Sequence, residues 1–281
     1  MGAKDPRLNA FGEIDFRIKR QLREYARTDD PPARVKPIAL PVLHFAYASA
    51  SASGLYEDIA IADVIYLAFF FLLRPGEFTI GPTNSHPFRL NDVQLWLGGQ
   101  RVDILQVHPE ELQNATFATL TFSNQKNGVR GEVIGHGFSG SHAACPVRTL
   151  VRRVCHLRSW GATGETPLCS YWSATDNCLI GVTAAQVTRA LRRAVAVIGN
   201  QHGIQQEDVS VRSLRSSGAM ALLCARVDAD RIRLIGRWRS DEMFRYLHVQ
   251  AYPVMKGFAR IMMDGGDYAL IPGQKIHPTI R

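Results

Sequence analysis

The chain has 281 residues, of which 46% are hydrophobic and 21% charged, a composition typical of one large or two small globular domains. It contains no internal repeat and no low-complexity block, which excludes repeat and disordered classes. The formal charge of +8 comes mainly from arginine, since only six of the 33 basic residues are lysine. A basic surface attracts polyanions, and an arginine can bind a phosphate through two hydrogen bonds. We therefore expect nucleic acid rather than an acidic membrane surface as the partner.

The five cysteines are odd in number and lack paired spacing. With no signal peptide at the start, this pattern predicts free thiols in a reducing, intracellular compartment. The alternative is a zinc site formed by His142, Cys145, Cys155 and His156. Cys145 opens a predicted helix and Cys155 falls within it, so ordinary buried or surface residues are the better interpretation. We expect no metal and no other cofactor.

The first 41 residues predict one helix and a linker. Over residues 8–27, apolar side chains recur at helical intervals opposite a basic face, as in an amphipathic helix. Residues 28–41 contain four of the fourteen prolines, which cannot sustain a helix or a central strand. A larger domain is therefore expected from residue 42.

Two helices are expected next, over residues 42–51 and 57–73. The apolar run at 64–73 is too short to span a bilayer at about 1.5 Å per residue, so we interpret it as a core helix and predict no membrane span. The sequence Arg74-Pro75-Gly76 ends this helix abruptly. It places the Arg74 guanidinium at the end of a rigid buried element, with Glu77 near enough to brace it.

Alternating apolar and polar residues predict strands between positions 93 and 104 and a clearer hairpin further on. In residues 119–125 apolar and polar side chains alternate, as in a strand. Asn127-Gly128 is the preferred two-residue hairpin turn, and residues 129–134 form the second strand. Lys126 would lie beside the tip of this hairpin, where it could reach into a groove.

Two helices with clear start signals follow the hairpin. Cys145-Pro146 opens the first, whose outer face is predicted to carry Arg148, Arg152 and Arg153. Residues 161–177 predict a loop with at most one short strand. Thr183-x-x-Gln186 is a capping box that opens the second, which runs to Ile198. Its basic face is either solvated or a DNA contact, and it consists of Arg189, Arg192 and Arg193.

The remaining chain predicts short helices. They cover residues 212–225, a segment capped by Asp228 through 235, and a segment capped by Ser240. Residues 253–263 form a last amphipathic segment, and residues 265–281, rich in Gly and Pro, form a tail.

Several residues suited to phosphate chemistry keep a fixed order along the chain. They are Arg74, Glu77, Lys126, Arg212, Arg215, Trp238 and Tyr246. In this order they resemble the catalytic domain of the tyrosine recombinases, the phage-integrase-like family, whose pattern is Arg-x-x-Glu, a hairpin Lys, His-x-x-Arg, His or Trp, and Tyr. The segments LLRPGEF, QKNGVRGE, SLRSSGA and GRWRSD are similar to the eukaryotic retroelement and transposon branch.

The resemblance covers residues 41–263 and implies an α+β fold, mainly α-helical, with a small antiparallel β-sheet at one edge. It implies that Arg74 and Arg215 bind the non-bridging oxygens of a scissile phosphate. Tyr246 would attack in line and form a 3′-phosphotyrosyl intermediate without metal or ATP, while Lys126 would protonate the departing 5′ oxygen. The indole of Trp238 would donate to the phosphate.

Other residues complete or depart from this pattern. Arg237 and Arg239 are expected to contact DNA. Arg212 replaces the family's His and cannot accept a proton at neutral pH, so we expect altered or reduced catalysis. Tyr246 lies one residue closer to Trp238 than is usual, and Tyr252 is the alternative nucleophile.

The resemblance also implies an organisation and partners. We expect residues 1–27 to be the remnant last helix of an N-terminal core-binding domain, 28–41 a linker, 42–264 the catalytic domain and 265–281 a tail. A site-specific recombinase or integrase of a mobile element would act on double-stranded DNA as a homo-tetramer, be a monomer without it, and lie in the nucleus of a eukaryote. Two alternatives stay open: a catalytically impaired or domesticated DNA-binding relic, and a relaxing enzyme like type IB topoisomerases.

Overall fold

The computed structural model describes residues 35–81, 85–123 and 131–238, together with 7, 11, 13–16, 18–21 and 24 before them and 253, 260, 262 and 263 after them. The chain divides into two units, Met1–Arg34 and Val35–Arg281. In the first unit the described helical positions are 16, 18–21 and 24, within the segment predicted to be an amphipathic helix. All elements named below belong to the second unit.

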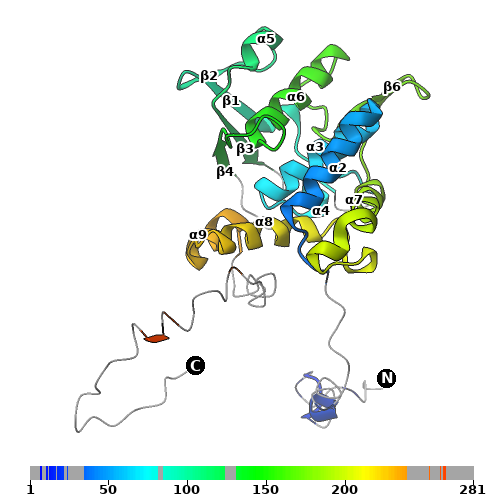
Figure 1. Ribbon diagram of the computed structural model, residues 1–281, viewed down its shortest axis with the longest axis vertical. Helices are drawn as coiled ribbons and strands as arrows, with labels where there is room; N and C mark the ends of the chain where they lie inside the picture. The colour runs from blue at the N-terminus through cyan, green and yellow to red at the C-terminus, as the bar shows by residue number, and fades with distance from the viewer. Residues whose placement is uncertain are drawn as a thin grey trace. The chain divides into compact units, whose positions relative to one another are not determined.

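A buried helix lies at the centre of the second unit. α3 (Tyr56–Phe70) is buried along most of its length and contacts α2 (Leu40–Ser53), α6 (Pro146–Ser159), α7 (Ala184–Ile198) and α8 (Ser213–Cys224). Figure 1 shows α2 and α3 running side by side through the middle of this unit. Because neighbours cover α3 on several sides, its sequence lacks a polar face, as the apolar run indicated.

The sheet lies to one side of these helices (Figure 1). Its strands are β1 (Val93–Leu97), β2 (Gln100–Val102), β3 (Phe117–Phe122) and β4 (Glu132–Gly137), all antiparallel in the order β2-β1-β3-β4. In the central register Leu120 pairs with both Val93 and Ile134. The predicted hairpin is therefore β3–β4, although its turn at 124–130 lies outside the described residues.

Short elements connect the larger ones. They are α4 (Pro75–Phe78), α5 (Pro109–Leu112) and the 3-10 turns Leu90–Asp92, Gly199–His202 and Gln206–Asp208. A second hairpin consists of β5 (Ser170–Ser173) and β6 (Cys178–Gly181). The sequence did not predict β6 or α5. The turn of this hairpin includes Asn177 at φ 52, a left-handed conformation that asparagine adopts more readily than most residues.

The helix starts predicted at Thr183 and Asp228 are confirmed, whereas the one predicted at Ser240 lies outside the described residues. Thr183 and Gln186 form the capping box of α7, with the Thr183 Oγ1 accepting the Gln186 N–H at 3.3 Å. The Asp228 carboxylate caps α9 (Ala229–Gly236) by accepting the Arg231 N–H at 2.8 Å. These caps satisfy donors that a helix leaves unpaired at its first turn, so their sequence signals are reliable.

The arginines of α6 differ from the prediction. Arg152 donates from Nε and Nη2 to Oδ1 of the buried Asp63 at 3.0 and 2.6 Å, joining α6 to α3. Arg153 is fully buried and donates to the carbonyl oxygens of Leu168 and Ser170. Two of the three side chains expected to face solvent therefore contribute to the interior, where each finds acceptors that offset the loss of hydration.

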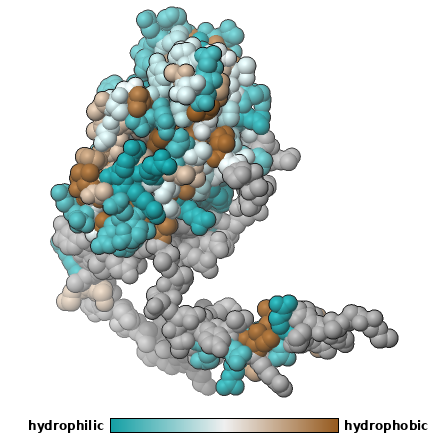
Figure 2. Space-filling model, turned by 90° about the vertical axis from the view of Figure 1, so that its right-hand side faces the viewer, coloured by the Kyte–Doolittle hydropathy of each residue, from teal (hydrophilic) through white to brown (hydrophobic). Residues whose placement is uncertain are grey.

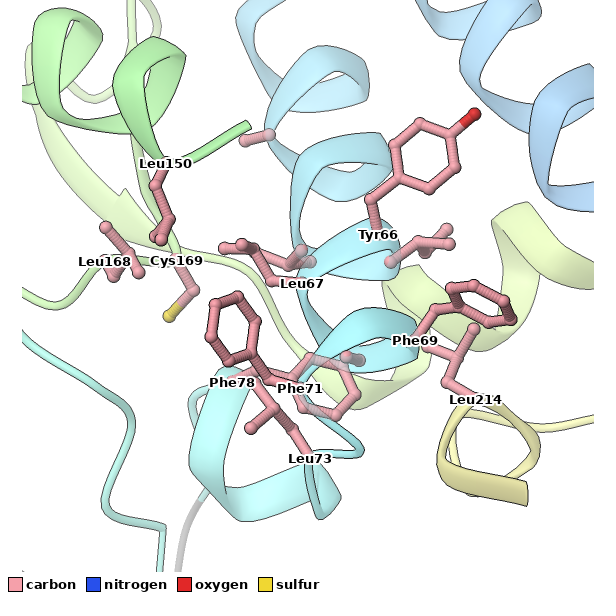
Figure 3. Packing of buried hydrophobic residues seen from close by; sticks show 14 of the residues in the cluster. Tyr66, Leu67, Phe69, Phe71, Leu73, Phe78, Leu150, Leu168, Cys169 and Leu214 are labelled. Atoms are coloured by element: carbon pink, nitrogen blue, oxygen red, sulfur yellow. The ribbon is translucent and has the colours of Figure 1, made fainter. Parts of the chain in front are cut away.

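The apolar interior forms two clusters that meet where α3 ends. Phe71 and Leu73 belong to the large cluster, which also takes side chains from the sheet, α6 and α7. Figure 3 shows them with Phe78 below the end of α3. Leu72, between them, belongs instead to a small cluster with Ala219, Ile232 and Trp238. The chain therefore turns between the two clusters, directly before Arg74.

The architecture is α+β and mainly helical, with a small antiparallel sheet at one edge, as predicted. The side of the molecule seen in Figure 2 mixes hydrophilic side chains with smaller apolar patches. Within the described part of the chain, no helix is both long and apolar enough to cross a membrane.

Candidate active site

Arg74 lies at the turn between α3 and α4. α3 ends at Phe70, earlier than predicted, because Leu72 adopts a left-handed conformation (φ 49) and the Leu73 N–H returns to the Ala68 carbonyl. Arg74 then precedes α4 in extended conformation (φ −82, ψ 151). This break points the Arg74 side chain away from the core, and it remains 30% exposed.

Glu77 braces Arg74 through both of its carboxylate oxygens. Oε2 accepts the Arg74 backbone N–H at 2.8 Å, and Oε1 accepts from Arg74 Nη1 at 3.2 Å. The carboxylate itself is only 5% exposed. The bracing contact expected from the sequence is present, and a buried carboxylate fixes a guanidinium that still reaches the surface.

Arg215 reaches the same turn from α8. Its Nη1 donates to the Leu72 carbonyl oxygen at 2.8 Å, and its Nη2 donates to the carbonyl oxygen of Gly236. This approach requires α8 to pack closely on α3, and a Cβ at Gly218 would lie 2.1 Å from the Phe69 carbonyl oxygen. Arg215 therefore contacts the turn that carries Arg74, two residues before it.

Trp238 and Arg212 occupy different environments. The Trp238 ring is 9% exposed and lies under Arg215, whose Cζ is 4.4 Å from the ring centroid. This stacking is a cation–π contact. A Cβ at Gly236 would lie 1.6 Å from the ring, so glycine is needed there. Arg212 is exposed at the N-cap of α8, one helical turn from Arg215.

Arg237, which was predicted to contact DNA, has a side chain that is 3% exposed. The guanidinium instead donates to Glu77 Oε2 and to the Leu72 carbonyl oxygen, both at 3.2 Å. Its Cζ lies 3.9 Å from the centroid of the Phe122 ring on β3. Sequence reasoning missed both this placement and Phe122.

Positive charge accumulates at this site. The guanidinium groups of Arg74 and Arg237 both donate to the Glu77 carboxylate, and that of Arg215 shares the Leu72 carbonyl oxygen with Arg237. Burial lowers the pKa of Arg237, and the neighbouring Glu77 carboxylate opposes that shift. Arginine keeps its proton at neutral pH in proteins, so the cluster retains net positive charge and suits an anion.

Strained backbone marks the same place. Among the described residues, four that are not glycine have positive φ, and two of them, Leu72 and Arg237, belong to this cluster. Each costs of order 1 kcal/mol, and such strain gathers at functional sites.

The remaining predicted site residues fall outside the described part of the chain. They are Lys126, Arg239, Tyr246 and Tyr252. The structure therefore gives the geometry of the phosphate-binding candidates and says nothing about the nucleophile or the general acid. No group of three or more His, Cys, Asp or Glu within the described residues is arranged to hold a metal ion.

The three arginines predicted on α7 are exposed. Arg192 Nε donates to the Val209 carbonyl oxygen at 3.2 Å, and Arg193 Nη2 lies 3.9 Å from Asp58 Oδ1. They border a surface hollow of about 570 Å³ lined by Ala184, Ala185, Thr188, Arg189, Arg192, Arg193 and Gln206. α7 lies on the right-hand side of Figure 1, the side that Figure 2 faces.

Comparison with known proteins gave structural similarity without a sequence match. No protein-family model matches the chain, and no curated protein matches it. The structure of XerA recombinase is 16% identical, with a TM-score of 0.46, over 86% of this chain and 67% of its own length. XerH site-specific recombinase, in a pre-cleavage complex with its difH substrate, is 12% identical, with a TM-score of 0.48, over 85% of this chain and 64% of its own. The chain thus spans about two thirds of the length of each of these two structures.

Proposed function

We propose that this chain is a DNA strand transferase of the tyrosine-recombinase type, which breaks and rejoins double-stranded DNA through a 3′-phosphotyrosyl intermediate. One observation carries the proposal. Arg215, from α8, donates to the carbonyl of Leu72, two residues before Arg74, so motif residues far apart in sequence form one cationic group. A phosphodiester is the anion that fits both this group and the basic composition of the chain.

Arg74 and Arg215 bind the non-bridging oxygens of the scissile phosphate and offset charge in the transition state. A guanidinium held before DNA arrives requires little reorganisation during the reaction, which is the basis of electrostatic catalysis. Glu77 and the Leu72 carbonyl supply that fixation. Trp238, stacked on Arg215, walls the pocket.

The covalent step exchanges one phosphoester for another. The Tyr246 oxygen bonds to phosphorus and passes its proton to solvent water, and the bond from phosphorus to the 5′ oxygen breaks, with Lys126 supplying a proton to that oxygen. The new ester keeps the energy of the old one, so a 5′ hydroxyl can reverse the step. The balance requires neither ATP nor a metal ion.

DNA contacts outside the scissile phosphate come from the exposed arginines of α7. They are Arg189, Arg192 and Arg193. XerH was solved with its DNA substrate, and by analogy this chain acts on duplex DNA, assembling as a tetramer on two duplexes. Phosphate contacts of this kind position the protein, while base contacts specify the site.

A second candidate is a DNA-binding relic that has lost the reaction. The observation that favours it is Arg212, which stands exposed at the start of α8 where the family has a proton-accepting His. An arginine there stabilises phosphate but provides no base. In the relic, the cationic group binds DNA without cutting it.

A nicked suicide duplex tests the proposal. The nick lets the 5′ strand fragment leave, so the covalent protein–DNA adduct accumulates and is counted on a denaturing gel. We expect an adduct with the wild-type chain and with Tyr252→Phe, and none with Tyr246→Phe. Shifted DNA without any adduct supports the relic. Relaxation of supercoiled DNA without sequence preference supports an enzyme of the topoisomerase type.

A further inference from the structure

Arg237 lies within the candidate active site without a part in the reaction described above. Its backbone is left-handed (φ 56, ψ 41) where α9 ends, and its side chain is 3% exposed. The Phe122 ring covers one face of the guanidinium. Both terminal nitrogens of the guanidinium donate to protein acceptors.

Hydrogen bonds fix this guanidinium on two sides. Nη1 donates to the carbonyl oxygens of Phe71 and Ile235, each at 3.2 Å. Nη2 donates to the carbonyl oxygen of Leu72 and to Oε2 of Glu77, each at 3.2 Å. One side chain therefore links the ends of α3 and α9, α4 and the β3 ring beneath it.

Two of those acceptors are shared with the arginines proposed to bind phosphate. The Leu72 oxygen also accepts from Arg215 Nη1, at 2.8 Å. Glu77 Oε2 also accepts the backbone N–H of Arg74, and Oε1 of the same carboxylate accepts Arg74 Nη1. Arg237 therefore shares one acceptor with each phosphate-binding arginine.

We propose that Arg237 is a positioning residue, which sets the orientation of Arg74 and Arg215 through Glu77 and the Leu72 carbonyl and does not touch DNA. The inference rests on the proposed function. Lysine cannot take this place, because a single ammonium neither spans acceptors on two sides nor stacks flat on Phe122.

The test compares rate with affinity in the full chain. We expect Arg237→Lys to slow adduct formation on the nicked duplex by about 100-fold, the loss that a displacement of about 1 Å causes. The dissociation constant for intact duplex, from fluorescence anisotropy, should stay unchanged. Arg153→Lys is the matched control: Arg153 is also fully buried on carbonyl oxygens but lies outside the site, and its replacement should leave the cleavage rate unchanged.

A double-mutant cycle separates positioning from direct contact. If Arg237 acts through Glu77, Arg237→Lys and Glu77→Gln together should be no slower than the worse single variant. Rate losses that multiply, or a weakened affinity for DNA, would show that Arg237 acts on the DNA itself. Phe122→Leu removes only the ring beneath the guanidinium, and it replaces Arg237→Lys in the cycle if that variant does not fold. It should also slow cleavage and be coupled to Glu77→Gln.

The outcomes separate the two claims. A wild-type chain that forms no adduct rejects the proposed function and this inference with it. If the wild type is active and Arg237→Lys or Phe122→Leu forms adduct at the same rate, the positioning role is rejected but the proposed function is not. Independent effects of Arg237→Lys and Glu77→Gln reject it as well.

Discussion

At the scale of single residues, the site is built from shared acceptors. The Glu77 carboxylate accepts hydrogen bonds from Arg74 and Arg237, and the Leu72 carbonyl oxygen accepts them from Arg215 and Arg237. Sharing couples the side chains, so the loss of one partner leaves buried charge uncompensated in the others. Surface ion pairs lack this property because water replaces the missing partner.

Glu77→Gln should therefore lower the free energy of unfolding by about 3 kcal/mol, since it removes one partner of a buried ion pair. Urea unfolding of the variant and the wild type measures the difference. Glu165→Gln is the control, because Glu165 pairs with Arg89 at the surface with side chains 66% and 48% exposed. Equal effects of the two substitutions would contradict the coupled arrangement.

Arg212→His should raise the rate of adduct formation by about tenfold or more, because a neutral imidazole accepts a proton that arginine cannot take. The rate is measured in a single turnover at neutral pH. Arg212→Gln, which removes the charge without supplying a base, should give no gain. A histidine variant no faster than wild type would show that the missing base is not what limits this chain.

At the scale of elements, close helix packing positions the site. α8 carries small buried side chains, among them Ser213, Ser216 and Ser217, and it lies close against α3. Ser217 also accepts the backbone N–H of Ile38 at 2.7 Å, which ties α8 to the segment before α2. Small residues let two backbones approach, and the approach lets Arg215 reach Leu72.

Gly218→Ala should destabilise the fold by about 1–3 kcal/mol, the usual cost of overpacking, and should slow adduct formation. The added Cβ would meet the Phe69 carbonyl oxygen at 2.1 Å, so α8 must move and take Arg215 with it. Gly137→Ala is the control, because its Cβ would lie 3.9 Å from the nearest atom, the Thr116 oxygen. Thermal unfolding and the gel assay give the two readouts. If Gly218→Ala unfolds and forms adduct like the wild type, α8 packs less closely on α3 than described.

His156 should make the contact between α6 and β5 sensitive to acid. Its Nε2 accepts the Trp172 N–H at 3.3 Å, and burial followed by the charge of Arg153 lowers the pKa of His156 to about 4 from 6.5. Below pH 6.5 the unfolded chain binds a proton before the folded chain does, so stability should fall from pH 6.5 to about 4 and then level off. His156→Gln, which does not titrate, should show a weaker pH dependence of the urea midpoint in this window. Identical profiles for variant and wild type would remove His156 as the cause.

At the scale of the whole molecule, the net charge of +8 is divided between buried and exposed arginines. Arg153 and Arg237 are buried in the interior, whereas the arginines of α7 are exposed to solvent. Only exposed charge releases counterions from DNA. Net charge therefore overstates the surface available for binding, and salt dependence measures the exposed part.

Arg189→Gln should reduce the slope of log K against log salt by about 0.9, the value for one lost phosphate contact on duplex DNA. Anisotropy titrations over a series of salt concentrations give the slope. Arg101→Gln, at an exposed arginine on β2, is the control and should leave the slope unchanged. If Arg189→Gln leaves the slope unchanged, Arg189 on α7 stays in solvent and does not contact DNA phosphate.

The sequence by itself determined the secondary structure that depends on local rules. Caps at Thr183 and Asp228, the helix break after α3 and the alternation in β3 all follow from the preferences of neighbouring residues. The order of the motif residues, and the recombinase resemblance it carries, could also be read directly.

The tertiary structure alone decided which arginines are buried and what they contact. Arg152, Arg153 and Arg237 read as surface residues because a charged side chain usually stays in water, yet their acceptors come from distant segments. A guanidinium can be buried only where several carbonyl or carboxylate oxygens converge on it. That convergence is set by how the helices and the sheet pack, which no local pattern encodes.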